Sequence, residues 1–599
     1  RRPHSETGEP PRDRYFRKPP RLPDPVALAN LFLSRAERTV RKTAIISLGG
    51  NRYLVDPELR EKKVEVRYDP FDLTRVEVWV DGRFYQVATP YALNKTSLRS
   101  TESAPAPTGL SMSYLRLLRA QHDRRLAEEV ERELHVPLGP LYLTRALEAA
   151  GFEVDFRDYQ CVQSDDPFEL PVFLDFLRDP APVIGLSCMA NLLPFTILAA
   201  RALREAYPDR VVVLGGVGSK AVEEKILTRF PWIEIIARGE GELSGPQLLA
   251  ALREKGDLAA VPGISYRRHG RVYHNPDPPR IKDLDSIAFP AFEKIDLRRY
   301  AGYGMMTSRG CPYPCTFCSV APVWNLESYS RSPKNIVDEM EFLHQAAGVN
   351  LFLFQDEFFV SGKRQVMNFC RELARRNLDV QWKAFGRINL VDEEMMQAMA
   401  DTGCVELRFG VESGSDRVLK EIKKGFTASQ SLEIVPKAVE LFPRVDAFFV
   451  WGFPFETMED FHQSLFQMVS FRMMGARILP SLLSLLPQTE LYRQWSQRVT
   501  LEFCPYLFPE FVFTGHEVCR GGIVELPQKH REYFDLIIAN PDVFPGFFHI
   551  DLEHNVLPKL ELLRQFGFYP EPQPQQPESC GAHSPRIEPQ ELATRAARG

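Results

Sequence analysis

The sequence predicts a multidomain α/β protein with a small all-β domain at its front and an irregular region near its end. Three observations support this prediction. Short strands fill residues 40–90, apolar strands alternate with amphipathic helices over 137–250, and a second α/β series covers 300–490. Strands that alternate with helices form parallel sheets covered by helices. The chain has 599 residues, which is enough for about three or four domains.

Residues 1–98 are predicted to hold a basic arm and a small β-barrel or sandwich. Gly49-Gly50-Asn51 and Asp81-Gly82 each separate two strand-forming runs, which is a hairpin signal. We interpret the cations of the arm as a solvated surface, and contact with phosphates is the alternative. These cations are Arg1, Arg2, Arg12, Arg14, Arg17, Lys18 and Arg21. A polar linker and a charged helix are expected over 99–136.

Residues 137–285 are predicted to form a doubly wound, Rossmann-like sheet. Helices are expected at 138–151 and near 191–206, the second with Pro194 in its first turn. The expected strands are 152–158, 181–188, 210–216 and 232–242. Ligands of such sheets bind at the carboxyl ends of the strands.

Residues 295–494 are predicted to form a partial (β/α)6 barrel. Its strands are expected within 304–310, 351–359, 380–388, 404–413, 445–454 and 476–484. The carboxyl ends of these strands are again the functional ends. The aromatic-rich region 495–567 is predicted to be an irregular cap, and the Pro-rich tail 568–599 to be disordered.

Three of the ten cysteines, Cys311, Cys315 and Cys318, lie within eight residues, directly after the first barrel strand. Thiolates at this spacing can wrap one face of a [4Fe–4S] cluster. Such clusters normally take four cysteines, and no fourth is nearby, so one iron would stay open. Zinc is the alternative, although structural zinc needs a closed set of four ligands. The other seven cysteines are scattered and are expected to be buried or incidental thiols, not ligands.

The pattern Cys311-x3-Cys315-x-Phe317-Cys318 resembles the signature of the radical S-adenosylmethionine (SAM) family, whose open iron chelates SAM. Other strand ends match that family by position, and "WGFPFET" (451–457) resembles its G-x-P-x-E-T turn. The basic residue of the third strand would pair with the SAM carboxylate through two hydrogen bonds. The resemblance implies SAM contacts at Phe317, Asp356, Glu357, Arg387, Glu412 and Ser413.

The preceding region resembles the cobalamin-binding domain found before many radical SAM domains. The resemblance lies in "PLGPLYLTRALEAAGFEV", "VIGLSC", "VVVLGGVGS" and "IIARGEGE". It implies cobalamin contacts at Leu138, Gly139, Ser187, Gly215, Gly216, Gly239, Glu240 and Gly241. The D-x-H-x-x-G motif that supplies a lower histidine ligand is absent. A charged stretch stands where the first core strand usually lies, so that strand is expected to be missing. A flavodoxin-like domain with another ligand is the alternative.

Residues 41–90 resemble the C-terminal β-barrel of Mu-type transposases of the integrase superfamily, without the catalytic core of that family. We interpret the chain as a fusion of a transposon end with a cobalamin-dependent radical SAM gene. The resemblance implies a C-methyltransferase that acts on a small-molecule or peptide substrate, with a reductant such as flavodoxin or ferredoxin. In this family, one SAM methylates cobalamin and a second provides the radical.

Four other functions stay open. They are cyclising or oxidative radical chemistry, methylthiolation of tRNA, DNA binding by a transposition protein through residues 1–98, and a fusion product without function. Methylthiolation would need a further cysteine trio and an RNA-binding barrel, which the sequence does not show. The net charge of −5 argues against nucleic acid as the main partner. The sequence has neither an apolar run of bilayer length nor a signal peptide, so we expect a cytoplasmic protein.

Overall fold

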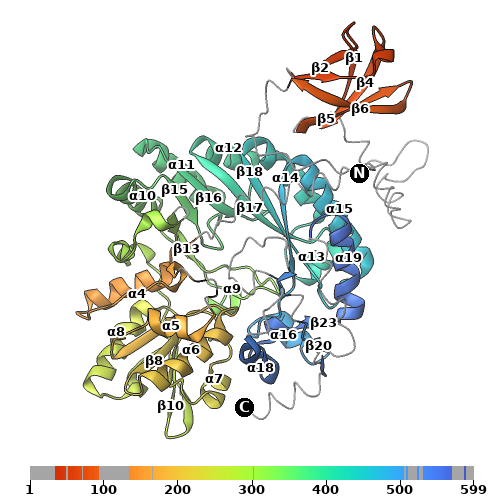
Figure 1. Ribbon diagram of the computed structural model, residues 1–599. Helices are drawn as coiled ribbons and strands as arrows, with labels where there is room; N and C mark the ends of the chain where they lie inside the picture. The colour runs from red at the N-terminus through yellow and green to blue at the C-terminus, as the bar shows by residue number, and fades with distance from the viewer. Residues whose placement is uncertain are drawn as a thin grey trace, which may run out of the picture. The chain divides into compact units, whose positions relative to one another are not determined.

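The structure, a computed structural model, forms two compact units, residues 1–125 and 126–599 (Figure 1). It describes residues 34–48, 51–69, 72–92, 134–162, 164, 166, 168–300, 303–504, 508–509, 523–524, 530–569 and 586–588. The predicted basic arm and most of the predicted charged helix lie outside these ranges. Within them, no helix is both long and apolar enough to span a lipid bilayer.

The first unit is an antiparallel sheet with strand order β1-β4-β5-β6-β3-β2. Its strands are β1 (Ser34–Thr39), β2 (Ile45–Leu48), β3 (Asn51–Leu54), β4 (Lys63–Asp69), β5 (Asp72–Val80) and β6 (Arg83–Ala92). The edge strands β1 and β2 also contact each other, so the sheet is close to a barrel around its apolar core. Asp81 and Gly82 both have positive φ between the paired residues Val80 and Arg83, which confirms the predicted hairpin turn.

The second unit begins with a five-stranded mixed sheet of order β11-β10-β9-β8-β7. Its parallel strands are β7 (Val183–Ser187), β8 (Val211–Gly215) and β9 (Ile235–Ala237), and an antiparallel hairpin, β10 (Ile264–Arg268) and β11 (Arg271–His274), extends it. The helices are α4 (Leu138–Ala149), α5 (Leu170–Phe176), α6 (Leu193–Ala206), α7 (Glu223–Arg229) and α8 (Gly241–Glu254). The three parallel strands and helices α4 and α6 lie where the sequence predicts them.

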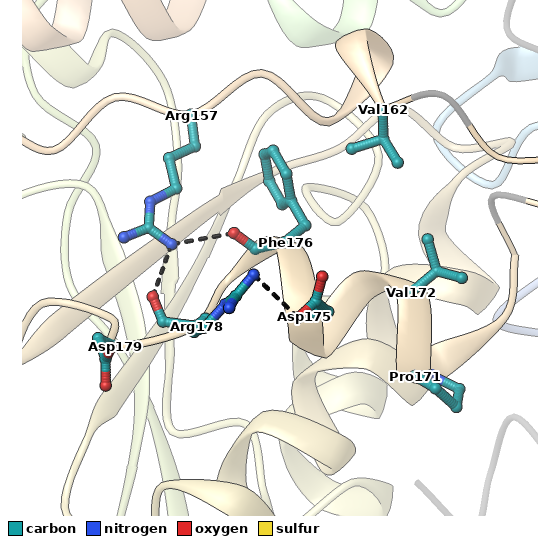
Figure 2. Close-up of a pocket in the computed structure, with 8 residues that line it drawn as sticks. All are labelled: Arg157, Val162, Pro171, Val172, Asp175, Phe176, Arg178 and Asp179. Carbon is teal, nitrogen blue, oxygen red and sulfur yellow. Dashed lines mark hydrogen bonds and ion pairs between the residues drawn. The ribbon is translucent and has the colours of Figure 1, made fainter.

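The strand predicted at 152–158 is wrong, because this segment pairs with no strand among the described residues. Arg157 instead fastens it to the end of α5, where its Nη1 donates to the carbonyl oxygens of Phe176 (3.0 Å) and Arg178 (2.9 Å). Figure 2 shows these bonds in a surface pocket beside α5. A strand needs a neighbouring ladder, and β7 forms the edge of the sheet where the missing first core strand would stand.

The second unit also contains a sheet of six parallel strands, which are adjacent in chain order (Figure 1). They are β12 (Tyr303–Met305), β15 (Leu351–Phe354), β16 (Gln381–Gly386), β17 (Cys404–Glu412), β18 (Arg444–Trp451) and β19 (Arg477–Leu482). Helices α10 (Pro333–Ala347), α11 (Lys363–Arg376), α12 (Glu393–Asp401), α14 (Ala428–Leu441) and α15 (Met458–Met474) connect them. All six strands lie within their predicted ranges or within a residue or two of them, and their carboxyl ends share one edge.

The C-terminal region contains more regular structure than predicted. Helices α16 (Glu490–Trp495), α18 (Arg531–Ala539) and α19 (Leu557–Gln565) accompany the short strands β20 (Leu501–Glu502), β23 (His549–Ile550) and β24 (Arg586–Ile587). Because β24 pairs with β20, the predicted disorder is wrong for Arg586–Ile587. Cys504 is disulfide-bonded, so the interpretation of this cysteine as an incidental thiol is also wrong.

Candidate functional site

The three clustered cysteines lie on a tight loop between β13 (Ser308–Arg309) and the short helix α9 (Val320–Val323). The N–H of Cys318 donates to the carbonyl oxygen of Cys315 (3.2 Å), which closes a turn. Gly310, just before the first cysteine, has φ +91°, and a Cβ there would stand 2.2 Å from the carbonyl oxygen of Glu327. The loop therefore needs glycine at this position to close on its own far end.

Two cations stand beside the three thiols, all of which are free and partly buried. Burial raises the pKa of Cys318 to about 12, and Lys424 opposes that rise. Burial likewise raises the pKa of Cys311, against Arg387. Arg387 Nη1 lies 3.8 Å from the sulfur of Cys315. Neighbouring cations favour the thiolate form, which is the form that binds metals.

The donor set suits an iron–sulfur cluster better than a single zinc ion. In the part of the chain that the structure describes, no three His, Cys, Asp or Glu side chains converge closely enough to hold one metal ion. A cubane spreads its thiolates farther apart than one ion does. Soft thiolate ligands favour iron–sulfur clusters.

Asp356, which follows β15, anchors the start of the cysteine loop. Its carboxylate is buried and accepts hydrogen bonds from the backbone N–H of Thr307 (2.8 Å), from Thr307 Oγ1 (2.7 Å) and from Ser308 Oγ (2.7 Å). The next residue, Glu357, is exposed, and its charge acts on Cys311. The two acidic residues thus differ, since one supports the loop and the other faces the first thiol from solvent.

Arg387, after β16, is placed to receive an anion. Its guanidinium lies 3.7 Å from the centre of the Tyr313 ring, and Nη2 donates to the carbonyl oxygen of Lys424. Its Nε is buried and has no hydrogen-bond acceptor among the residues that the structure describes. A buried N–H without an acceptor is unfavourable unless a ligand supplies one. A carboxylate such as that of SAM fits this requirement.

Glu412 ends β17 in a strained conformation, with φ +67°. Its Oε1 accepts a hydrogen bond from Lys424 Nζ (2.6 Å), and that ammonium group lies 5.9 Å from the Phe317 ring centre. Non-glycine residues with positive φ gather at functional sites. The sequence analysis missed Lys424, because a lysine in a loop that contains several charged residues gives no signal of its own.

Ser413 has a supporting position. Its hydroxyl is fully buried, lies 2.9 Å from Ser464 Oγ and accepts from the backbone N–H of Ser415 (3.1 Å). It thereby ties the end of β17 to α15. Phe317 packs edge-on against Phe453, with the ring centres 5.8 Å apart.

The strand ends of the five-stranded mixed sheet bring three of the predicted cobalamin contacts together. Ser187 and Gly215 are paired at the ends of β7 and β8, and Gly216 follows with φ +87°. A Cβ on Gly216 would stand 2.4 Å from the carbonyl oxygen of Cys188. A Cβ on Gly218 would stand 2.5 Å from a backbone carbon of Met189. These glycines let two strand-end loops approach each other closely.

Three buried polar atoms near these strand ends have no hydrogen-bond partner within the described residues. They are Asn191 Nδ2, Ser219 Oγ and Ser244 Oγ, which follow β7, β8 and β9. Buried polar groups are normally satisfied, so these atoms suit a ligand with amide and other polar groups, as cobalamin has. The sequence analysis missed all three, because isolated Ser and Asn residues give no signal.

The other predicted cobalamin residues lie on two adjoining elements. Leu138 and Gly139 form the first turn of α4, and Gly239 and Gly241 flank the start of α8. The two helices pack together where Leu143 of α4 meets Gly241 and Gly245 of α8.

Glu240 is oriented toward the cysteine loop. Its Oε1 accepts from Arg309 Nη1 (2.9 Å), and its Oε2 accepts from the backbone N–H of Ile281 (2.7 Å). Lys220, from the loop after β8, donates to the carbonyl oxygen of Val323 (2.7 Å) at the end of α9. The strand-end loops of the five-stranded mixed sheet therefore contact β13 and α9, the two elements that flank the cysteine loop.

Three family models match the chain. The B12 binding domain matches residues 126–249, the radical SAM superfamily matches 305–468, and the Mu transposase C-terminal model matches 29–85. The chain carries a B12-binding domain followed by a radical SAM domain. The three resemblances found in the sequence are thereby confirmed.

Curated proteins with similar sequences include a methyltransferase, a cyclase and a methylase by name. The uncharacterized methyltransferase PH0819 of Pyrococcus horikoshii is 30% identical over 46% of this chain and 62% of its own length. The anaerobic magnesium-protoporphyrin IX monomethyl ester cyclase of Rubrivivax gelatinosus is 30% identical over 55% of this chain and 61% of its own length. The hopanoid C-3 methylase of Methylococcus capsulatus is 27% identical over 51% of this chain and 59% of its own length. The chain thus spans roughly three fifths of the length of these curated relatives.

Two solved structures share the fold. The radical SAM methyltransferase TsrM from Kitasatospora setae, solved with cobalamin and a [4Fe–4S] cluster, has a TM-score of 0.52 at 20% identity. This match covers 61% of this chain and 72% of TsrM. The cobalamin-dependent radical enzyme OxsB has a TM-score of 0.51 at 18% identity, over 72% of this chain and 68% of its own.

Proposed function

We propose that this protein is a cobalamin-dependent radical SAM enzyme that methylates an unactivated carbon of a small-molecule or peptide substrate. One observation carries the proposal. From the strand ends of the six-stranded parallel sheet, Arg387 contacts the loop with the three cysteines and Asp356 holds the residues just before it. From the strand ends of the five-stranded mixed sheet, Glu240 and Lys220 contact β13 and α9, the two elements that flank this loop. Such a loop suits a reaction shared by a cluster-bound nucleotide and a corrin. The relatives named methyltransferases and a methylase support the same reaction.

The domain limits belong to this proposal. Residues 137–285 would form the doubly wound cobalamin domain, and 295–494 would form the partial (β/α)6 barrel. Region 495–567 would be the cap. A flavodoxin or ferredoxin as reductant, a weak DNA contact through residues 1–98 and a cytoplasmic location stay predictions.

In the radical SAM domain, Cys311, Cys315 and Cys318 would hold the [4Fe–4S] cluster, and Arg387 and Lys424 would stabilise their thiolates. Arg387 would bind the SAM carboxylate through its unsatisfied Nε. When bound, the cluster, SAM and cobalamin supply the radical and methyl-transfer chemistry.

The remaining predicted SAM residues divide into contacts and supports. Phe317, Glu357 and Glu412 would approach SAM directly, from the loop and the strand ends. Asp356 and Ser413 would support the site without contacting SAM, because their side-chain oxygens already form hydrogen bonds within the protein. Their partners are Thr307, Ser308, Ser415 and Ser464.

In the B12-binding domain, the corrin would bind at the loops that follow β7 and β8. Ser187, Gly215 and Gly216 would let the ligand approach the backbone, and Gly239, Gly241, Leu138 and Gly139 would border it. The unsatisfied groups of Asn191, Ser219 and Ser244 would bond to its polar substituents. The chain's own contribution would be to hold the two ligands near each other, because the residues proposed for both sites contact the elements beside the cysteine loop.

Cyclisation is a second candidate reaction, because three relatives are named ester cyclases. The products separate the two reactions. Methyl transfer from SAM leaves S-adenosylhomocysteine together with 5′-deoxyadenosine, whereas cyclisation leaves 5′-deoxyadenosine alone.

The test is anaerobic reconstitution with iron, sulfide and hydroxocobalamin, followed by counts of iron and cobalt per chain. We expect one cluster and one cobalt in the wild-type protein, and both nucleoside products after SAM and reductant are added. Cys315→Ala should lose the bound iron. Cys370→Ala, which removes a buried cysteine of α11, should keep it. Unchanged iron in the Cys315→Ala protein would refute the ligand assignment.

A further inference from the structure

We propose that Glu240 of the B12-binding domain is a positioning residue for the cysteine loop. Through Arg309 and Arg280, its carboxylate would hold both ends of the loop that carries the three thiols. This inference rests on the proposed function and gives Glu240 a different role from the cobalamin contact predicted from the sequence.

The first end of the loop is held by Arg309, two residues before Cys311. Its Nη1 donates to Glu240 Oε1 (2.9 Å), its Nη2 donates to Glu242, and its Nε lies 3.1 Å from the sulfur of Met306. Every nitrogen of this guanidinium therefore has a partner. Contacts at all three nitrogens therefore fix the orientation of the Arg309 guanidinium.

The second end is held by Arg280. Its Nη1 donates to the carbonyl oxygen of Trp324 (3.0 Å), six residues after Cys318, and its Nη2 donates to that of Arg309 (3.4 Å). The guanidinium also lies 4.4 Å from the centre of the Trp324 ring. Arg280 thus links the start of the loop to its end, and its Nε lies 3.3 Å from Glu240 Oε2.

The four charged groups balance one another in a buried place. Two carboxylates, Glu240 and Glu242, face two guanidinium groups, Arg309 and Arg280, and all four side chains are at most 13% exposed. Burial alone would lower the pKa of Arg309, but the two carboxylates outweigh it and raise that pKa. Removing one charge leaves another buried without compensation, which is strongly unfavourable. The loop therefore has its lowest energy only when the B12-binding domain is docked.

The consequence is a mechanical link between the two cofactor sites. Glu240 is the N-cap residue of α8, on the loop where cobalamin is predicted to bind. A displacement of that loop would act on Arg309 and Arg280, and through them on the position of Cys311. The cluster geometry should therefore depend on an acidic residue that touches neither the cluster nor the corrin.

The experiment compares Glu240→Gln with the wild-type holoprotein, loaded with cluster and cobalamin without oxygen. The amide can still accept from the N–H of Ile281, but it lacks the charge that Arg309 and Arg280 require. We expect unchanged cobalt per chain, iron release to a chelator about tenfold faster or more, and an altered EPR spectrum of the reduced cluster. Arg309→Lys keeps a charge but loses the planar fork, so it should release iron at an intermediate rate.

The control is Arg229→Gln, which weakens an ion pair between the same domain and Asp542 of the C-terminal region. It should leave iron release unchanged. Glu240→Gln and Arg309→Lys combined should not exceed Glu240→Gln alone, because both act on one network. Loss of cobalt with normal iron release in Glu240→Gln would overturn the inference, and so would wild-type values for both. If Glu240→Gln does not fold, wild-type iron release in Arg309→Lys would overturn it. A wild-type protein that holds neither cofactor would defeat the proposed function itself.

Discussion

The two adjacent glycines at the end of β8 differ in what a side chain would meet. Gly216 has φ +87°, and a Cβ there would stand 2.4 Å from the carbonyl oxygen and 2.9 Å from the nitrogen of Cys188. At Gly215, a Cβ would have no atom within 4 Å. Gly216→Ala should therefore destabilise the B12-binding domain, whereas Gly215→Ala should leave its stability unchanged.

The magnitude follows from two contributions. An L-residue with positive φ costs about 1–2 kcal/mol. The overlap involves backbone atoms of Cys188, which cannot rotate away as a side chain can, and forced shifts of this kind cost about 1–3 kcal/mol. Gly216→Ala should thus reduce the free energy of unfolding by about 2–5 kcal/mol.

The assay combines thermal unfolding of the cobalamin-free protein with a cobalamin titration. Gly216→Ala should lower the unfolding temperature before any ligand is added. Gly215→Ala should unfold like the wild type but bind cobalamin more weakly if the corrin lies against that glycine. Equal unfolding temperatures for the two variants would refute the steric reasoning.

Three further changes test other parts of the molecule. Lys559→Met leaves Glu456 buried without its 2.7 Å partner, so the free energy of unfolding should fall by about 3–5 kcal/mol. In a denaturant titration, adding Glu456→Gln to this variant should recover most of the loss. Additive losses in the double variant would contradict this explanation. Burial lowers the pKa of His549 to about 4, below the roughly 6.5 of an unfolded histidine. Its contribution to stability is therefore complete well above pH 6.5, about 2 kcal/mol smaller at pH 5 and smallest below pH 4. Urea titrations at pH 7.5 and 5 should show this loss in the wild type but not in His549→Gln, and equal losses would exclude His549 as the cause. Arg387→Met should weaken SAM binding about ten- to a hundredfold in an EPR titration of the iron-loaded protein. An unchanged affinity would remove Arg387 from the SAM site.

Much of the second unit was predictable because its signals are local. Apolar runs such as "LFLF" and "VVVLGG" indicate buried strands, and glycine and acidic residues at their ends mark the functional edge. Chain order then determines strand order, since consecutive parallel strands lie side by side. Segment 152–158 shows the limit of such reasoning, because its alternating pattern suits a strand but no neighbouring strand is available.

The sequence alone determined that three thiols stand together, since eight residues of chain cannot separate them far, and it determined the order of the α/β units. Only the tertiary structure decided how the charged side chains are used. Glu240 and Arg309 are 69 positions apart, and Asp356 and Thr307 are 49 apart, yet each pair is joined by buried hydrogen bonds. A carboxylate in a strand-end motif can face a ligand or a neighbouring loop equally well. The choice depends on which groups the folded chain buries beside it, because a buried charge must find its partner there.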